Sequence, residues 1–180
     1  MLNLNQKILT VSSKSDGKFL RKKMADFDFS EFTKKEITAL VKNMREIMLK
    51  ADGVGLAANQ IGLNMRMFVA QIQKLDKYGN PRSLSHAEQK FYAIFNPEIV
   101  KSSKEKGAME EGCLSVPGGV FGDVERPEKI TIVGFDKNGK KIKIKAWGLL
   151  ARVFQHEVDH LNGILYIDKA KNIRKVSSES

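Results

Sequence analysis

The sequence has few cysteines, no long apolar run and no repeats, and each absence argues against one class of protein. It holds one cysteine in 180 residues, so it forms no intramolecular disulfide, which fits a reducing cytosol. No apolar run approaches the roughly 18 residues of a membrane span, and the first residues lack the apolar segment of a secretory signal. Internal repeats and long linkers are also missing. We therefore expect a single cytoplasmic domain over residues 1–180, with a basic tail from about 169 and no membrane contact.

Positive charge, by contrast, is abundant. The chain carries 31 Lys and Arg against 21 Asp and Glu, a net charge of +10. Lysines are dense in KNGKKIKIK (137–145) and KAKNIRK (169–175), and no aromatic residues interleave with them as in a platform for stacked bases. A solvated basic surface and a polyanion partner explain this charge equally well, because lysines release counterions when they meet phosphates.

The spacing of apolar residues predicts two long helices. Thr33 and Glu36 can form a capping box ahead of apolar residues at helical spacing, so we predict a helix near 34–50. A second apolar stripe predicts a helix over 148–161, which the Asn-Gly pair at 162–163 ends in a left-handed turn. The members of this second stripe are Leu149, Val153, His156 and His160.

Short apolar runs and period-two alternation predict strands around these helices. The clearest hairpin pairs residues 130–135 with 141–147. In the second strand the lysines form a solvent-exposed face and the isoleucines a buried face. Its Asn138-Gly139 pair suits a type I′ turn, in which both central residues have positive φ. Further strands are expected over 65–72, 91–97 and 97–102, the last two bent at Pro97. Loops are expected over 12–18 and 73–90.

Strands in runs, with separate helices, predict an α+β fold. We expect antiparallel or mixed sheets packed around a central helix that bears the HEVDH segment, and an N-terminal helix.

Two of the three histidines stand four positions apart in HEVDH, residues 156–160. Four positions make about one helical turn, so both imidazoles face the same side and can grip one divalent ion. Glu157 lies about 100° around the helix from His156, close enough to reach water on such an ion. Histidines that merely complete an apolar stripe are the weaker interpretation, because the chain has so few. His86 is taken as a surface residue.

A catalytic metal site needs a third protein ligand and one open position. Downstream, Tyr166 stands where metzincin proteases carry their last histidine, Glu179 lies in the tail, and Asp168 follows the second histidine closely. Upstream, GCLSVP (112–117) supplies Cys113, a soft donor, although lone cysteines more often pack as small hydrophobes. Cys113 is preferred as the third ligand because the downstream candidates are weak, and because Gly112 lets the backbone approach closely and Pro117 fixes the segment after it. Asp168 stays open as an alternative ligand.

Three segments together resemble the ordered motifs of the peptide deformylases. They are GVGLAANQIG (53–62), EGCLSVPG (111–118) and QHEVDHLNG (155–163), and the resemblance covers roughly residues 5–168. Within the first segment, Asn59 stands where relatives commonly carry proline or threonine. The resemblance implies a hydrolase that removes the formyl group from the N-terminal formylmethionine of newly made polypeptides and releases formate.

The resemblance also implies a role for each matching residue. One divalent ion per chain is implied, ferrous iron in cells and often zinc or nickel after purification. Glu157 would carry a proton from water to the departing amine, while the Gln60 amide and the Leu114 backbone N–H would meet the formyl oxygen. The implied metal ligands are Cys113, His156 and His160.

The substrate contacts follow from the same resemblance. Gly55 would pair its backbone with the peptide as a strand does, while Glu111 and Arg126 would support the substrate site. The implied partners are nascent formylmethionyl polypeptides and, from the basic charge, the ribosome surface rather than DNA. The methionine side chain is implied to enter an apolar pocket of Val54, Leu149, Val153 and the His156 ring.

Two other functions remain open at this level. A zinc endopeptidase would use a third ligand such as Asp168 and a cleft for internal peptide bonds. A basic RNA-binding or ribosome-associated module would hold a structural zinc. A structural site usually recruits four protein ligands, and the chain could add only His86.

Overall fold

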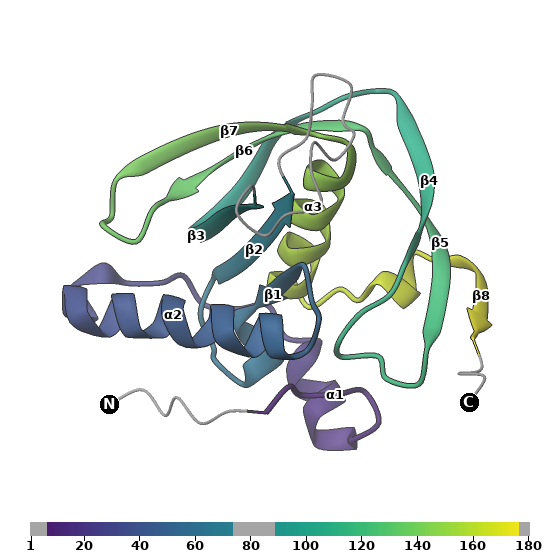
Figure 1. Cartoon of the computed structure of the whole chain (residues 1–180), viewed down its shortest axis with the longest axis horizontal. Coiled ribbons are helices and arrows are strands. Elements are labelled where there is room, and N and C mark those ends of the chain that lie inside the picture. The colour runs from purple at the N-terminus through teal and green to yellow at the C-terminus, as the bar shows by residue number, and fades with distance from the viewer. Residues whose placement is uncertain (1–6, 74–88, 177–180) are drawn as a thin grey trace.

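The computed structural model describes residues 7–73 and 89–176, which form a mixed α+β fold with two antiparallel sheets (Figure 1). The five-stranded sheet has the order β1-β2-β3-β6-β7 and the three-stranded sheet the order β4-β5-β8, which confirms the predicted fold class. The first sheet contains β1 (Gly55–Ala57), β2 (Met67–Gln73), β3 (Gln89–Ser102), β6 (Lys129–Phe135) and β7 (Lys141–Trp147). The second contains β4 (Lys106–Glu111), β5 (Val120–Pro127) and β8 (Lys171–Lys175). The α-helices of the described ranges are α1 (Lys14–Leu20), α2 (Lys34–Lys50) and α3 (Gly148–Leu161).

Helices α2 and α3 pack on opposite faces of the five-stranded sheet. Strand β2 shows why, because its side chains alternate between the two faces. Phe68 and Ala70 join the core formed with α3, whereas Met67 and Val69 join the core formed with α2. A strand buried on both faces needs apolar residues at nearly every position, and this confirms the strand predicted from the run at 65–72.

Both long helices begin and end near the predicted residues. In α2, Thr33 Oγ1 accepts from the Glu36 backbone N–H at 3.2 Å and Glu36 Oε2 accepts from that of Thr33 at 2.9 Å, which is the predicted capping box. Helix α3 stops before Gly163, whose φ of +74° is the predicted left-handed turn. Helix α3 lies between the two sheets and contacts β1, β2 and β5 (Figure 1). No helix among the described residues is long and apolar enough to span a bilayer.

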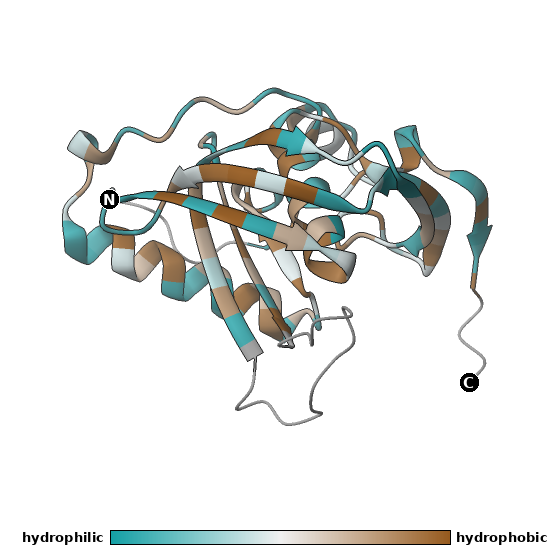
Figure 2. Ribbon diagram, turned by 90° about the horizontal axis from the view of Figure 1, so that it is seen from above, coloured by the Kyte–Doolittle hydropathy of each residue, from teal (hydrophilic) through white to brown (hydrophobic). Residues whose placement is uncertain are grey.

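The β6–β7 hairpin forms as predicted, but its turn differs. Lysines and isoleucines alternate along β7, with the lysines exposed and the isoleucines packed toward α3 (Figure 2). Gly139 has φ +75°, whereas Asn138 does not adopt a positive φ, so the type I′ prediction is wrong. Instead, Asp136 Oδ1 accepts from the backbone N–H groups of Asn138 and Lys140 at 2.8 and 2.9 Å. This cap favours a three-residue loop with glycine in the left-handed position.

Two local predictions need correction. The polar segment 12–18 is not a loop, because Ser13 caps helix α1 and Leu20 at its end is fully buried. The strands expected on either side of Pro97 are one strand, β3, with an irregular register between Phe95 and Glu98. Asn96 has φ +47° at this point. The loop expected over 73–90, with His86, falls mostly on residues 74–88, outside the described residues.

The three-stranded sheet was not anticipated from the sequence. Strands β4 and β8 bury almost no residues, and only one of the three alternate buried positions of β5, Val124, is a large apolar residue, so the sheet carries little of the apolar alternation that reveals a strand. Part of the expected basic tail forms β8, which pairs with β5 and is exposed along its length. Arg174 in β8 forms ion pairs with Glu110 and Asp123, so the positive tail is held by acidic residues of the neighbouring strands.

Candidate metal centre

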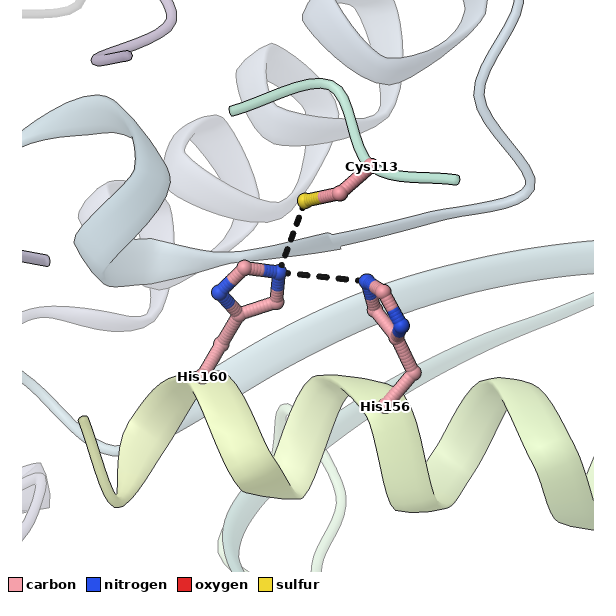
Figure 3. Close-up of side chains that lie close together, drawn as sticks. All are labelled: Cys113, His156 and His160. Carbon is pink, nitrogen blue, oxygen red and sulfur yellow. Dashed lines mark hydrogen bonds between the residues drawn. The ribbon is translucent and has the colours of Figure 1, made fainter. Parts of the chain in front are cut away.

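Three donor atoms from two distant segments meet beside α3. The helix presents His156 and His160 on one side, and the loop after β4 brings Cys113 toward them (Figure 3). Cys113 Sγ lies 3.2 Å from His160 Nε2, which lies 3.2 Å from His156 Nε2. The three donor atoms all lie within 4.8 Å of one another. The sulfur and both nitrogens therefore point at a common volume.

This donor set fits one divalent ion. Bond lengths near 2.3 Å for sulfur and 2.0–2.1 Å for nitrogen place tetrahedral ligands about 3.4 Å apart. The contacts of 3.2 Å agree with that separation. Thiolate and imidazole suit iron, zinc and nickel alike, so the donors fit a metal without selecting among these.

The backbone around Cys113 is arranged to deliver its sulfur. A Cβ atom at Gly112 would lie 2.7 Å from the ring of Phe121, so the chain passes this ring only with glycine there. The backbone N–H of Ser115 donates to Sγ at 3.4 Å and the amide of Gln60 at 3.6 Å. Burial would raise the pKa of this thiol, but His160 and hydrogen bonds from both imidazoles lower it well below its usual value. Cys113 is thus poised as a thiolate.

His156 is oriented by a buried carboxylate. Its Nδ1 lies 3.0 Å from Glu111 Oε2, which leaves Nε2 facing the sulfur side. Burial would lower the pKa of His156, but hydrogen bonds with Cys113 and Glu111 raise it to about 10. The pKa of Glu111 is driven below its usual value, because hydrogen bonds from His156 and Arg126 outweigh its burial. The site therefore holds two anionic groups that favour a cation.

A buried ion network extends from Glu111 away from the metal site. Arg126 donates to both Glu111 oxygens, at 2.6 and 2.9 Å, and to Asp159 Oδ2 at 2.7 Å. Arg152 donates to Glu111 Oε1 at 2.6 Å, and Lys169 donates to Asp159 at 2.7 Å. Arg152, Asp159 and Lys169 were missed by the sequence reasoning. The available signal was the presence of Arg152 and Asp159, besides Glu157, in the mostly apolar helix 148–161.

Glu157 faces the pocket from the side of β1. Its side chain is buried, yet Oε2 has no hydrogen-bond partner among the described residues. Burial raises the pKa of Glu157 to about 7, although the imidazoles pull it down. A Cβ atom at Gly55 would overlap the Glu157 carboxylate, so glycine at this position leaves room for that group. A carboxylate with this pKa exchanges a proton readily near neutral pH.

The 3-10 helix η2 (Ala58–Ile61) holds Gln60 and Asn59 against the site. Gln60 Oε1 accepts from the Ala57 backbone, while its Nε2 donates to Ser115 Oγ at 3.1 Å and points toward Cys113. Asn59 is fully buried and its amide donates to the His160 carbonyl at 2.7 Å. The unusual Asn59 thus ties η2 to the end of α3.

A pocket of about 580 Å³ is lined by two of the donors, Cys113 and His156, while His160 lies buried beneath it. One edge of β1 pairs with β2, and the chain from Gly53 to Gly55 lines the pocket. Val54 and Leu149 line it with 48% and 38% of their surface exposed, which leaves apolar area open to a ligand. The backbone N–H of Leu114 donates to no acceptor within the described ranges. Of the expected substrate-binding residues, these line the pocket: Val54, Gly55, Glu111, Leu149 and Val153.

Arg126 does not line this pocket. It lies behind Glu111 and is almost fully buried, so it touches the site only through that carboxylate. The structure thus gives it a supporting position, and gives Arg152 a place in the pocket wall.

The comparisons with known proteins agree on one family. Residues 6–176 match the family model described as polypeptide deformylase. A peptide deformylase of Symbiobacterium thermophilum is 49% identical over 144 residues, which cover 79% of this chain and 59% of that relative. The crystal structure of a probable peptide deformylase from Synechococcus phage S-SSM7 superposes with a TM-score of 0.77 at 39% identity, covering 92% of this chain and 99% of the other. A Met-Ala-Ser-bound class I type b peptide deformylase from Acinetobacter baumannii has a TM-score of 0.77 at 30% identity, covering 91% and 97%. Sequence and structure alike therefore show that the chain belongs to the polypeptide deformylase family.

Proposed function

We propose that the protein hydrolyses the formamide bond of N-terminal formylmethionine in newly made polypeptides and releases formate. Its site of action is then the cytoplasm, where these chains emerge from ribosomes. The observation that carries the proposal is the donor cluster of Cys113, His156 and His160 beside a pocket that Glu157 also lines, where Glu157 Oε2 has no hydrogen-bond partner among the described residues.

Cys113, His156 and His160 would hold the cation. Bound there, a divalent ion makes water a competent nucleophile near neutral pH. We propose Fe²⁺ in cells, with Zn²⁺ or Ni²⁺ after purification, because the soft sulfur and two imidazoles accept each of them.

Glu157 is assigned the proton transfers. Glu157 lines the pocket, its buried Oε2 has no hydrogen-bond partner among the described residues, and a pKa of about 7 suits both halves of the task. The carboxylate takes a proton from the attacking water and gives it to the nitrogen of the departing amine. General acid–base transfer of this kind typically contributes ~10²–10⁴-fold in rate.

The developing charge on the formyl oxygen needs donors. Leu114 has a backbone N–H without a described acceptor, and Gln60 Nε2 lies 3.6 Å from the cysteine sulfur, beside the donor cluster. We assign both groups to the formyl oxygen. Removing one such donor typically lowers the rate by ~10²–10³-fold.

The substrate backbone is assigned to the open edge of β1. This edge strand leaves Gly55 beside the pocket, where an extended peptide can add as a further strand. Val54, Leu149 and Val153 supply an apolar surface for the methionine side chain. The Met-Ala-Ser ligand of the Acinetobacter relative is the kind of peptide this arrangement would release.

The decisive test is formate release from formyl-Met-Ala-Ser by protein purified without oxygen and analysed for metal. The parent should release formate with about one metal ion bound per chain. Glu157→Gln should keep the metal and lose at least about 100-fold in kcat. Cys113→Ser should lower metal affinity and activity together. Normal metal content and normal turnover in both variants would refute the assignment.

The same assay separates this proposal from an endopeptidase. An endopeptidase would cleave internal bonds of peptides whose amino terminus is acetylated. The deformylase proposal expects no cleavage of such peptides and requires the formyl group.

A further inference from the structure

A second hollow lies on the face of the five-stranded sheet opposite α3, at the β7 side and separate from the metal pocket. It measures about 440 Å³ and is formed by the ends of β3, β6 and β7. We call it the lysine groove. Its charged and aromatic lining residues are Lys101, Lys129, Lys145 and Trp147. None of these residues lines the pocket over the metal donors.

The strand register explains why these side chains gather. Lys101 of β3 lies opposite Thr131 of β6, which lies opposite Lys145 of β7. Residues directly opposite in an antiparallel pair project from the same face. In the next row, Lys129 lies opposite Trp147. Two cross-strand rows therefore place three lysines around one indole.

Period-two alternation extends this face along β7. Lys141 and Lys143 precede Lys145 at two-residue intervals and are exposed on the same side. Thr131, which lies between Lys101 and Lys145 in the first row, is buried, so the two lysine side chains flank a packed residue. Five ammonium groups thus share a surface that spans three strands.

Trp147 changes the interpretation of the basic charge. The sequence showed no aromatic residue interleaved with the lysines, but folding brings this indole beside Lys129 of the neighbouring strand. It is 42% exposed, which is unusual for the largest apolar side chain. It is also the only tryptophan in the chain.

Few carboxylates offset these lysines. Glu98 lies one register step away, opposite Val133, and Glu105 and Glu128 lie beyond the Ser103 rim. None of the ion pairs formed within the described ranges involves a lysine of the groove or of β7. The face therefore complements a polyanion.

We propose that the lysine groove and the β7 lysines dock single-stranded RNA, with phosphates on the lysines and one unstacked base on Trp147. A positive groove with an exposed aromatic ring is the arrangement that binds single strands without sequence preference. The choice of RNA rests on the proposed function, because nascent chains emerge from a particle whose surface is rich in RNA. The docking places the enzyme near its substrate and takes no part in hydrolysis.

Binding of a fluorescein-labelled 12-nucleotide RNA, followed by anisotropy across a salt series, tests the charge contribution. Five lysine–phosphate contacts predict a slope of log affinity against log salt of about −3.5. The triple change Lys101→Gln, Lys129→Gln, Lys145→Gln should reduce that slope by about 2. The matched control removes three exposed lysines of α2, through Lys34→Gln, Lys35→Gln and Lys50→Gln. It should leave the slope within one unit of the parent.

The indole gives a second, independent readout. Stacking of a base on Trp147 should quench the single tryptophan emission when unlabelled RNA is added. Trp147→Ala should weaken binding about 5- to 150-fold, and Trp147→Phe should recover most of the loss. Unchanged melting temperatures would show that these exposed positions act on binding and not on folding.

The outcomes separate docking from catalysis. Every variant should release formate from formyl-Met-Ala-Ser at the parental rate, since none touches the metal pocket. Equal losses in the groove and α2 triple variants would overturn the proposal in favour of general charge attraction. No effect of Trp147→Ala, or equal binding of heparin or anionic vesicles with the same quench, would also overturn it. Failure of formate release in the parent would refute the proposed function and leave the RNA result standing.

Discussion

Replacing the buried carboxylate of Glu111 should lower the stability of the protein, and the size of the loss can be worked out from the contacts of Glu111. It accepts four hydrogen bonds, two from Arg126, one from Arg152 and one shared with His156 Nδ1, at 2.6–3.0 Å. In Glu111→Gln, one of the two acceptor oxygens becomes an NH₂ group that faces donors in either orientation. The substitution also leaves the Arg152 guanidinium buried without its ion-pair partner.

Removing one partner of a buried ion pair usually costs about 3–5 kcal/mol. We expect the lower end, about 3 kcal/mol, because Arg126 keeps Asp159 and Arg152 keeps the carbonyls of Val124 and Gly107. For a chain of this size that corresponds to a melting temperature lower by about 6–12 °C. Metal affinity should fall about 10- to 100-fold, since His156 loses the acceptor that orients its ring.

The assay is urea unfolding with chelator present, so that protein stability is measured apart from metal binding. Glu110→Gln is the matched control, because the neighbouring glutamate pairs with Arg174 at the surface, where both side chains are 46% exposed. It should change stability by at most about 1 kcal/mol. If the Glu111 and Glu110 variants unfold within about 1 kcal/mol of each other, the network does not stabilise the fold as argued.

Three further predictions follow from other contacts. Gly55→Ala places a methyl group on the Glu157 carboxylate, so kcat should fall by about 100-fold while metal content stays at the parental level; unchanged kcat would contradict this. Asn59→Ala removes the buried donor to the His160 carbonyl and should lower the free energy of unfolding by about 1–3 kcal/mol in urea. The hydrogen bond from Arg21 lowers the pKa of Asp168 below 3.8, so its stabilisation is complete above that pH and is lost as pH falls through the lowered pKa. Asp168→Asn should therefore flatten the decline in melting temperature between pH 5 and pH 2, and an unchanged profile would refute the pair's role.

The sequence predicted the metal donors because their chemistry is local. Two histidines at i and i+4 must share a helix face, and this holds before any tertiary contact is known. Cys113 was preferred because the downstream residues offered poor ligands, and the resemblance then implied it, while Asp168 stayed open from the residues alone. In the structure, Asp168 instead pairs with Arg21 and accepts from the Leu165 backbone, which excludes it from the donor cluster.

Secondary-structure elements that depend on contacts with residues far away in the sequence could not be predicted from local patterns. Helix α1 is short and polar, and what identifies it is the burial of Leu20 against the rest of the protein. The hairpin turn depended on one carboxylate, Asp136, capping the N–H groups that a type I′ turn would have placed differently. Local propensity is a weak guide at such positions because a single side chain selects between turns of similar energy.

The buried charges were missed for a further reason, which also explains the basic tail. Arg152 and Asp159 occupy polar positions in a helix whose pattern predicts only its apolar face, so their partners on β4 and β5 are invisible in the sequence. Lys169 lies where the tail begins, and its contact with Asp159 joins the tail to the network around His156. Arg126 is shared between the carboxylates of Glu111 and Asp159, so the positive charge of Lys169 helps to neutralise Asp159. The residues after α3 therefore help to hold the metal site, even though β8 itself lies exposed at the edge of its sheet.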